Sequence, residues 1–220
     1  MNTVIRTQVT RDNVDEVIEK TVAHFKSKNV TSFSWWTEPG TQPKDLGKYL
    51  VAHGFTYTEG PPGMAVDLLK LNEDFITPPG LTVKSVGDAG ALRKWVHTLI
   101  IGFGLPDVGE KAFFDLLIGL GFDLPLNNYI GFLNGEPVAV AELFLGAGVA
   151  GIYGVVTAPE ARRRGIGTAL TLAPLREARA MGYRIGILHS SEMGLGVYRW
   201  CGFQEYCRMN HCVWAGETSQ

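Results

Sequence analysis

The residues best suited to chemistry lie within one stretch, 153–168. An apolar, β-branched run ends at a proline-bearing turn, Arg162–Arg164 follow, and Gly165 and Gly167 open a segment with helical spacing of apolar residues. Because the two glycines have no side chains, a ligand can approach the backbone N–H groups of the first helical turn, which lack partners within the helix. Together with the helix dipole and the arginines, these donors predict a pyrophosphate-binding site.

Two common phosphate-binding loops do not fit this stretch. The dinucleotide fingerprint needs three spaced glycines and an acidic residue about 20 positions later, and the P-loop ends in Gly-Lys-Ser/Thr. The pattern that fits is Arg162-x-x-Gly165-x-Gly167 directly after a predicted strand. It resembles the acyl-CoA signature, Gln/Arg-x-x-Gly-x-Gly/Ala, of the GNAT superfamily of N-acyltransferases. For the hexapeptide alone, an ordinary basic helix start is the alternative.

The segments that follow extend this resemblance. A predicted helix over 165–181 leads to a short buried strand over 184–189, and Tyr198 stands four residues before Gly202-Phe203. This order is similar to the C-terminal half of GNAT proteins, and the resemblance spans 81–214. It implies an α/β fold with a mixed, mostly antiparallel central sheet flanked by helices, the acyl-CoA N-acyltransferase fold. It also implies acetyl-CoA (CoA) as the co-substrate, with no metal.

The resemblance assigns cofactor contacts residue by residue. Pantetheine would lie along the end of the strand, the pyrophosphate at the arginine-glycine loop, and the thioester near residues 189–198. Tyr198 matches the family tyrosine that protonates the departing CoA sulfur, with a core tyrosine on a short helix as the alternative. The predicted cofactor-binding residues are Val155, Val156, Thr157, Arg162, Arg163, Arg164, Gly165, Ile166, Gly167, Thr168 and Ser190.

Glu142 is the leading candidate for the general base. Alternation along 137–145 places it among apolar residues on a strand whose two faces are otherwise apolar. A lone carboxylate there must be paired, protonated or functional, because an unpaired buried charge is costly. A salt bridge or a strand end that reaches solvent is the structural alternative. His189 is the second candidate base, since imidazole titrates near neutrality.

The elements that position these groups divide at 72–80, where paired prolines and a glycine disfavour a continuing helix or strand. After this linker we expect a strand over 81–86, helices over 88–101 and 108–120, and a meander of strands over 128–133, 137–145 and 149–156. Asn134-Gly135 is a strong hairpin signal. One last strand is expected over 204–213. The predicted domains are 1–76 and 81–214.

The first predicted domain echoes the second. Its order is helix (13–26), strand (31–37), a helix that starts at Pro43, His53-Gly54-Phe55 and then strands over 55–58 and 64–71. This order parallels the later run over 165–213, which contains Cys201-Gly202-Phe203. Residues 1–76 are therefore interpreted as a smaller, degenerate half-GNAT-like α/β domain. They have no glycine-arginine loop, so a CoA site is not expected there. An unrelated α/β extension is the alternative.

Composition narrows the classes of function. The net charge of −2 implies no broad basic surface for nucleic acid. No apolar run has the length needed to cross a membrane, and the first ten residues lack the apolar middle of a signal peptide. Three late cysteines do not suit a secreted disulfide framework, and no close ligand pair indicates zinc. We therefore expect a cytoplasmic protein without membrane or nucleic-acid partners.

These observations predict an N-acetyltransferase that transfers an acetyl group from acetyl-CoA directly to a primary amine of a small molecule. A protein N-terminus or a lysine is the alternative acceptor. A non-catalytic acyl-CoA-binding sensor or interaction module is the alternative function, and a homodimer built through residues 1–76 is a further alternative role for that segment.

Overall fold

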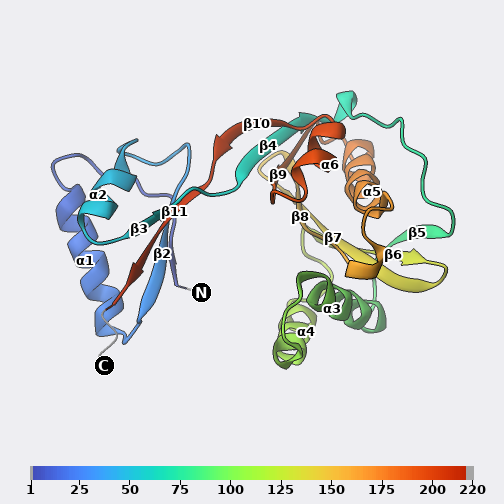
Figure 1. Ribbon diagram of the computed structural model, residues 1–220, viewed down its shortest axis with the longest axis horizontal. Coiled ribbons are helices and arrows are strands. Elements are labelled where there is room, and N and C mark those ends of the chain that lie inside the picture. Colours follow the sequence, from blue (N-terminus) through green and yellow to red (C-terminus); the bar gives the residue numbers. More distant parts are fainter. Residues whose placement is uncertain (1, 217–220) are drawn as a thin grey trace. The chain divides into compact units, whose positions relative to one another are not determined.

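The computed structural model describes residues 2–216 and contains two compact units (Figure 1). The smaller unit combines the chain up to Gly63 with the chain from Glu205 onward, and the larger unit is Met64–Gln204. The chain therefore passes from one unit to the other twice. None of the helices that the structure describes is long and apolar enough to cross a membrane.

A sheet of seven strands runs through the larger unit, in the order β10-β4-β9-β8-β7-β6-β5, although only Gln204 of the edge strand β10 belongs to that unit. The β5–β6, β6–β7 and β7–β8 pairs are antiparallel, whereas β8 and β9 are parallel. The predicted hairpin at Asn134-Gly135 joins β6 to β7. The strands are β4 (Pro62–Asp67), β5 (Leu81–Ser85), β6 (Leu126–Leu133), β7 (Glu136–Gly146), β8 (Val149–Thr157), β9 (Ile185–His189) and β10 (Gln204–Arg208).

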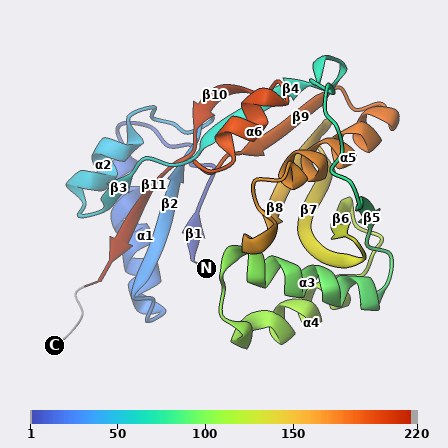
Figure 2. The ribbon, with the colours of Figure 1, turned by 45° about the vertical axis from the view of Figure 1, so that its right-hand side comes forward.

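Helices cover the two faces of this sheet (Figure 2). Helix α5 (Ile166–Ala180) packs on one face, where Ala139, Ala141 and Leu143 of β7 join the main core. Helices α3 (Ala89–Phe103) and α4 (Glu110–Leu120) pack on the other face against Ile130 and Val140. The short elements are the helix α6 (Leu195–Trp200) and the 3-10 turns η1 (Leu68–Lys70), η2 (Asp107–Gly109) and η3 (Pro159–Ala161).

The smaller unit has a four-stranded sheet in the order β1-β2-β11-β3. Its core gathers Trp35 of β2 with Val14 and Ile18 of α1, Leu46 of α2 and Cys212 of β11. The C-terminal strand β11 lies between β2 and β3 and is antiparallel to both. The elements are β1 (Thr3–Val4), α1 (Val14–Ser27), β2 (Ser32–Thr37), α2 (Leu46–Ala52), β3 (Thr56–Thr58) and β11 (Asn210–Ala215).

The observed units differ from the predicted domains 1–76 and 81–214. Strand β4 comes from the N-terminal segment, yet Met64 and Val66 are buried in the core of the larger unit. Strand β11 comes from the C-terminal segment and completes the smaller unit. The composition of 72–80 marks a linker, but burial of these strands decides where each unit ends. The interpretation of the N-terminal segment as a degenerate half-GNAT copy stays a prediction.

The single last strand predicted over 204–213 is wrong, because the structure has two strands there, β10 and β11, with a break at Met209. The Met209 N–H donates to Pro61 O at 3.1 Å. A Cβ at Gly60 would lie 1.6 Å from Met209 O, so only glycine fits beside the break. Local β propensity continues through this stretch, and the break depends on residues distant in sequence.

Candidate active site

Strand β8 loses one neighbour and bulges against the other where the site lies. Its pairing with β9 ends at Gly151, which lies opposite Ile187. Against β7, Val140 pairs with Val156 and Glu142 with Tyr153, so the register shifts around Gly154, whose φ is 56°. An extra residue in one strand leaves backbone groups unpaired. The end of β8 therefore offers backbone N–H and C=O groups along Val155–Thr157, the segment predicted to contact pantetheine.

The loop between β8 and α5 has the form predicted for a phosphate site. After η3, Arg163 and Gly165 have positive φ values of 59° and 77°, and Gly165 is the N-cap of α5. The Ala169 N–H donates to Gly165 O at 3.2 Å. The N–H groups of residues 166–168 precede this bond and thus lack helical partners. These donors and the positive end of the helix dipole suit an anion.

The two glycines of the signature have different surroundings. A Cβ at Gly165 would lie 3.1 Å from Phe75 Cε2, so an aromatic ring covers this glycine. A Cβ at Gly167 would lie 3.9 Å from Thr157 Oγ1, with no closer atom. Gly167, not Gly165, therefore presents an uncovered face toward the end of β8.

Arg162 holds the loop in place through backbone carbonyls. Its Nε donates to Thr157 O at 3.0 Å, and its Nη2 donates to Gly102 O at 2.8 Å. These bonds join the end of β8 to the last turn of α3, where a cation also complements the helix dipole. The guanidinium is thus engaged with the protein, whereas the side chains of Arg163 and Arg164 are exposed. Arg162 is suited to position the loop, and the other two are suited to meet an anion.

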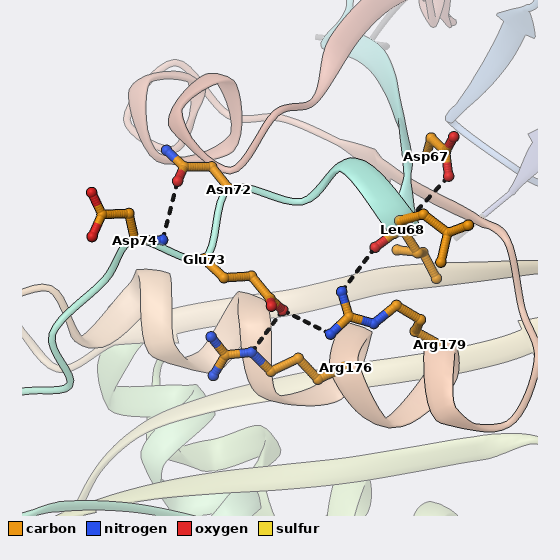
Figure 3. A network of polar contacts seen from close by, with 8 residues as sticks. Asp67, Leu68, Asn72, Glu73, Asp74, Arg176 and Arg179 are labelled. Carbon is orange, nitrogen blue, oxygen red and sulfur yellow. Dashed lines mark hydrogen bonds and ion pairs between the residues drawn. The ribbon is translucent and has the colours of Figure 1, made fainter.

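A segment that we call the strap, residues 71–79, crosses α5 (Figure 3). Glu73 Oε1 accepts from Arg176 Nε at 2.9 Å and from Arg179 Nη2 at 3.0 Å. The hydrogen bond from Arg176 chiefly holds the pKa of Glu73 below its usual value. Phe75 contacts Trp200 edge to face, with ring centroids 6.0 Å apart. The strap therefore fixes the ring that covers Gly165.

Glu142 lies at the bulge. Its Oε2 is 3.3 Å from the position that a Cβ on Gly154 would occupy. By alternation with Val140 its side chain is on the face that α3 and α4 cover, and the structure shows no hydrogen bond or ion pair to its carboxyl group among the described residues. Burial raises the pKa of Glu142. A carboxyl group with a raised pKa beside unpaired backbone is the expected form of a general base.

His189 is the last residue of β9, and Tyr198 lies in α6, the helix that follows. Tyr198 is 8% exposed, and burial, with a smaller contribution from Cys201, raises its pKa to about 12. It therefore keeps its proton at neutral pH, as a general acid must. His189 is exposed as a whole residue, yet partial burial of its ring lowers its pKa. Ser190 is buried and donates to Ser191 O at 2.7 Å, so its hydroxyl already has a partner.

The structure thus brings together the loop, the end of β8 and Glu142, because all three follow or adjoin one strand. Tyr198 and His189 belong to the neighbouring parallel strand β9 and the helix after it, and parallel strands end at the same edge of a sheet. The sequence analysis missed two features, the bulge and the ring of Phe75. An isolated glycine at position 154 inside a strand pattern was a signal for the bulge. No local signal pointed from Phe75 to Gly165.

Comparisons with known proteins give a family match for part of the chain and a shared fold. Residues 100–203 match the family model described as "Acetyltransferase (GNAT) family". No curated protein sequence matches the chain.

Three solved structures show the similarity of fold. A GCN5-related N-acetyltransferase from Kribbella flavida is 22% identical, with a TM-score of 0.71 over 91% of this chain and 74% of its own. One from Sphaerobacter thermophilus is 15% identical, with a TM-score of 0.73 over 93% and 69%. A tandem GNAT protein from the clavulanic acid biosynthesis pathway is 15% identical, with a TM-score of 0.66 over 96% and 72%. The match therefore assigns residues 100–203 to the GNAT acetyltransferase family, and the solved structures show that the chain shares the fold of GNAT acetyltransferases.

Proposed function

We propose that the protein is an N-acetyltransferase that transfers the acetyl group of acetyl-CoA to a primary amine of a small molecule. The observation that carries this proposal is the place of Glu142. Its partly buried carboxyl group has no cationic partner among the described residues and lies beside the β8 bulge at Gly154. A proton acceptor is thus held where β8 has parted from β9, the position expected for a thioester.

The transfer needs only a base, an acid and hydrogen-bond donors. Glu142 takes a proton from the ammonium form of the acceptor, and the free amine nitrogen attacks the thioester carbon. Unpaired N–H groups near Val155 and Val156 would stabilise the oxygen that becomes negative. The C–S bond then breaks and the thiolate takes the phenolic proton of Tyr198. The second proton that the nitrogen must lose goes to solvent, from which the phenolate of Tyr198 regains a proton. The products are an N-substituted acetamide and CoA.

The anion site would be filled by the pyrophosphate of the co-substrate. The N–H groups of residues 166–168 donate to it from the start of α5, and Arg163 and Arg164 add positive charge. Arg162 would act indirectly by holding the loop. Ser190 stays a predicted contact of the thioester region, although the bond of its hydroxyl to Ser191 O leaves it less available.

The test is calorimetric titration of the full chain with acetyl-CoA and CoA, followed by an amine screen that detects the free thiol. Gly167→Trp should abolish binding because its ring would fill the uncovered face, and Gly167→Ala, the matched control, should bind as the wild type does. Release of thiol that depends on an amine supports the proposal. Saturable binding without turnover, unchanged in Glu142→Gln, would instead support an acyl-CoA sensor, and no binding would refute both.

A further inference from the structure

One buried polar atom near Glu142 has no partner in the protein. Asn128 Oδ1 is buried, and no described residue donates a hydrogen bond to it. The backbone of Asn128 is well held, since its carbonyl oxygen accepts from Val86 N at 2.8 Å. Buried polar atoms in native proteins nearly always have a partner. An unpaired carbonyl oxygen fixed at this place therefore indicates a donor that comes from outside the chain.

Asn128 stands directly opposite Glu142 in the β6–β7 ladder. Opposed residues of an antiparallel pair point to the same face, with Cβ atoms about 5 Å apart. Glu142 in turn pairs with Tyr153 on β8, next to the bulge. The row from β6 to β8 thus contains an amide oxygen, a carboxylate and then Tyr153, which precedes the bulge at Gly154.

Of this row, Asn128 lines a pocket of about 30 Å³, together with Leu117 and Leu120 of α4. Its volume suits a group the size of one water molecule. Apart from Asn127 and Asn128 its walls are apolar or glycine, and no charged side chain of the described chain lines it. Three of its lining residues, Leu120, Phe122 and Leu124, are 52%, 41% and 39% exposed, so they also offer apolar surface to solvent.

We propose that Asn128 determines acceptor specificity by accepting a hydrogen bond from the amine that Glu142 deprotonates. The two side chains present oxygen acceptors to a group with up to three N–H donors, which fits a primary ammonium. The apolar surroundings fit an uncharged carbon skeleton. A carboxylate on the acceptor would find no cation in the pocket. The preferred substrate class is therefore a primary amine on an apolar skeleton, rather than an amino acid.

This inference rests on the proposed function, so its test measures binding as well as turnover. The probe is 2-phenylethylamine, with phenylalanine as the analogue that differs by a carboxylate. Each is titrated against the CoA-loaded protein, and the KM and kcat of acetyl transfer are measured with acetyl-CoA. The wild type should bind the amine at least tenfold more tightly than the amino acid. The free-energy cost of burying the unpaired carboxylate of phenylalanine exceeds the contribution of one hydrogen bond.

Asn128→Leu removes the oxygen with little change of volume. Loss of a hydrogen bond to a charged group should weaken binding of 2-phenylethylamine and raise its KM by about 10- to 100-fold, while the Kd of CoA stays unchanged. The Tm should stay equal or rise, because an unpaired buried atom is removed. Asn128→Asp keeps an oxygen at this place and should retain amine binding within about threefold.

The outcomes separate the two proposals. Amine binding without transfer, lost in Asn128→Leu, would support the role of Asn128 and refute catalysis. Transfer that is unchanged in Asn128→Leu would support catalysis and overturn the role of Asn128, since a water molecule would then satisfy the oxygen. Failure of the wild type to bind 2-phenylethylamine, or tighter binding of phenylalanine, would also overturn the inference.

Discussion

Replacing Arg162 with methionine should damage both stability and CoA binding, although the residue faces backbone and not ligand. The methionine keeps most of the aliphatic bulk and removes the two hydrogen bonds, to Thr157 O at 3.0 Å and to Gly102 O at 2.8 Å. The first acceptor ends β8 and the second lies in the last turn of α3. Without the guanidinium, the phosphate loop loses its hydrogen bonds to both carbonyl oxygens.

The size of the effect follows from the number and exposure of these bonds. A hydrogen bond from a charged donor contributes about 1.5–3 kcal/mol when it is well buried. Arg162 is only half-buried, so water can replace part of each bond, and the pair should contribute about 1–3 kcal/mol in total. For a chain of this size, each kcal/mol lowers the Tm by about 2–4 °C. We therefore expect the Tm of the larger unit to fall by about 2–12 °C.

Thermal unfolding and CoA titration of Arg162→Met and Arg164→Met together provide the assay. The Arg164 side chain is exposed, and its loss should change the free energy of unfolding by less than about 0.5 kcal/mol. It should still weaken CoA binding, with a smaller dependence of affinity on salt. Arg162→Met should lower the Tm and the affinity together. An unchanged Tm in Arg162→Met would refute the positioning role, and unchanged affinity in both variants would refute the phosphate site.

Three further predictions concern other parts of the larger unit. Because burial raises the pKa of Glu142 above its usual 4.5, the protonated form favours folding below the unfolded-state pKa, and that contribution is lost as pH rises through the folded-state pKa. In thermal unfolding at about pH 8, Glu142→Gln should thus be at least as stable as the wild type. Its rate of acetyl transfer should fall by about 10²–10⁴-fold. A Glu142→Gln protein that is less stable than the wild type at high pH but not at low pH would contradict the predicted pH dependence of stability. Phe75→Ala should cost about 1–2 kcal/mol in stability, as a partly buried ring leaves Gly165, yet CoA affinity should stay within about threefold because Gly167 is uncovered; titration showing a large change would mean that the strap covers the ligand. The fragment 78–220 lacks β4 and should show no cooperative melting by circular dichroism, and a soluble fragment with a sharp transition would show that β4 is dispensable.

Local signals predicted much of the larger unit. The strands of the meander, the hairpin at Asn134-Gly135 and the long helices appear where alternation and helical spacing placed them, within a few residues. The N-cap of helix α3 is Asp88, whose side chain accepts from Ala91 N, and its C-cap is Gly104, in the left-handed region. Such signals succeed because caps and turns depend on residues close in sequence.

The strand pairing and part of the site could not be predicted, because they depend on residues that are distant in sequence. Nothing local shows that β11 pairs with β2, or that β4 supplies Met64 to the core of the larger unit. The site shows the same limit. Glu142 was found because a charge interrupts an apolar pattern, whereas Asn128 opposite it gave no signal until the register placed the two side chains together.

The double passage of the chain between the units also sets the order in which they can form during synthesis. Strand β2 of the smaller unit leaves the ribosome long before β11, but the core of this unit includes Cys212 and Trp214 of β11. At about 5–20 residues per second, translation separates these segments by roughly 10–30 s. During that interval β2 has an open edge where β11 later pairs, a site for unwanted strand association. Slow translation should therefore favour aggregation of nascent chains, whereas folding of the complete chain from denaturant avoids this delay.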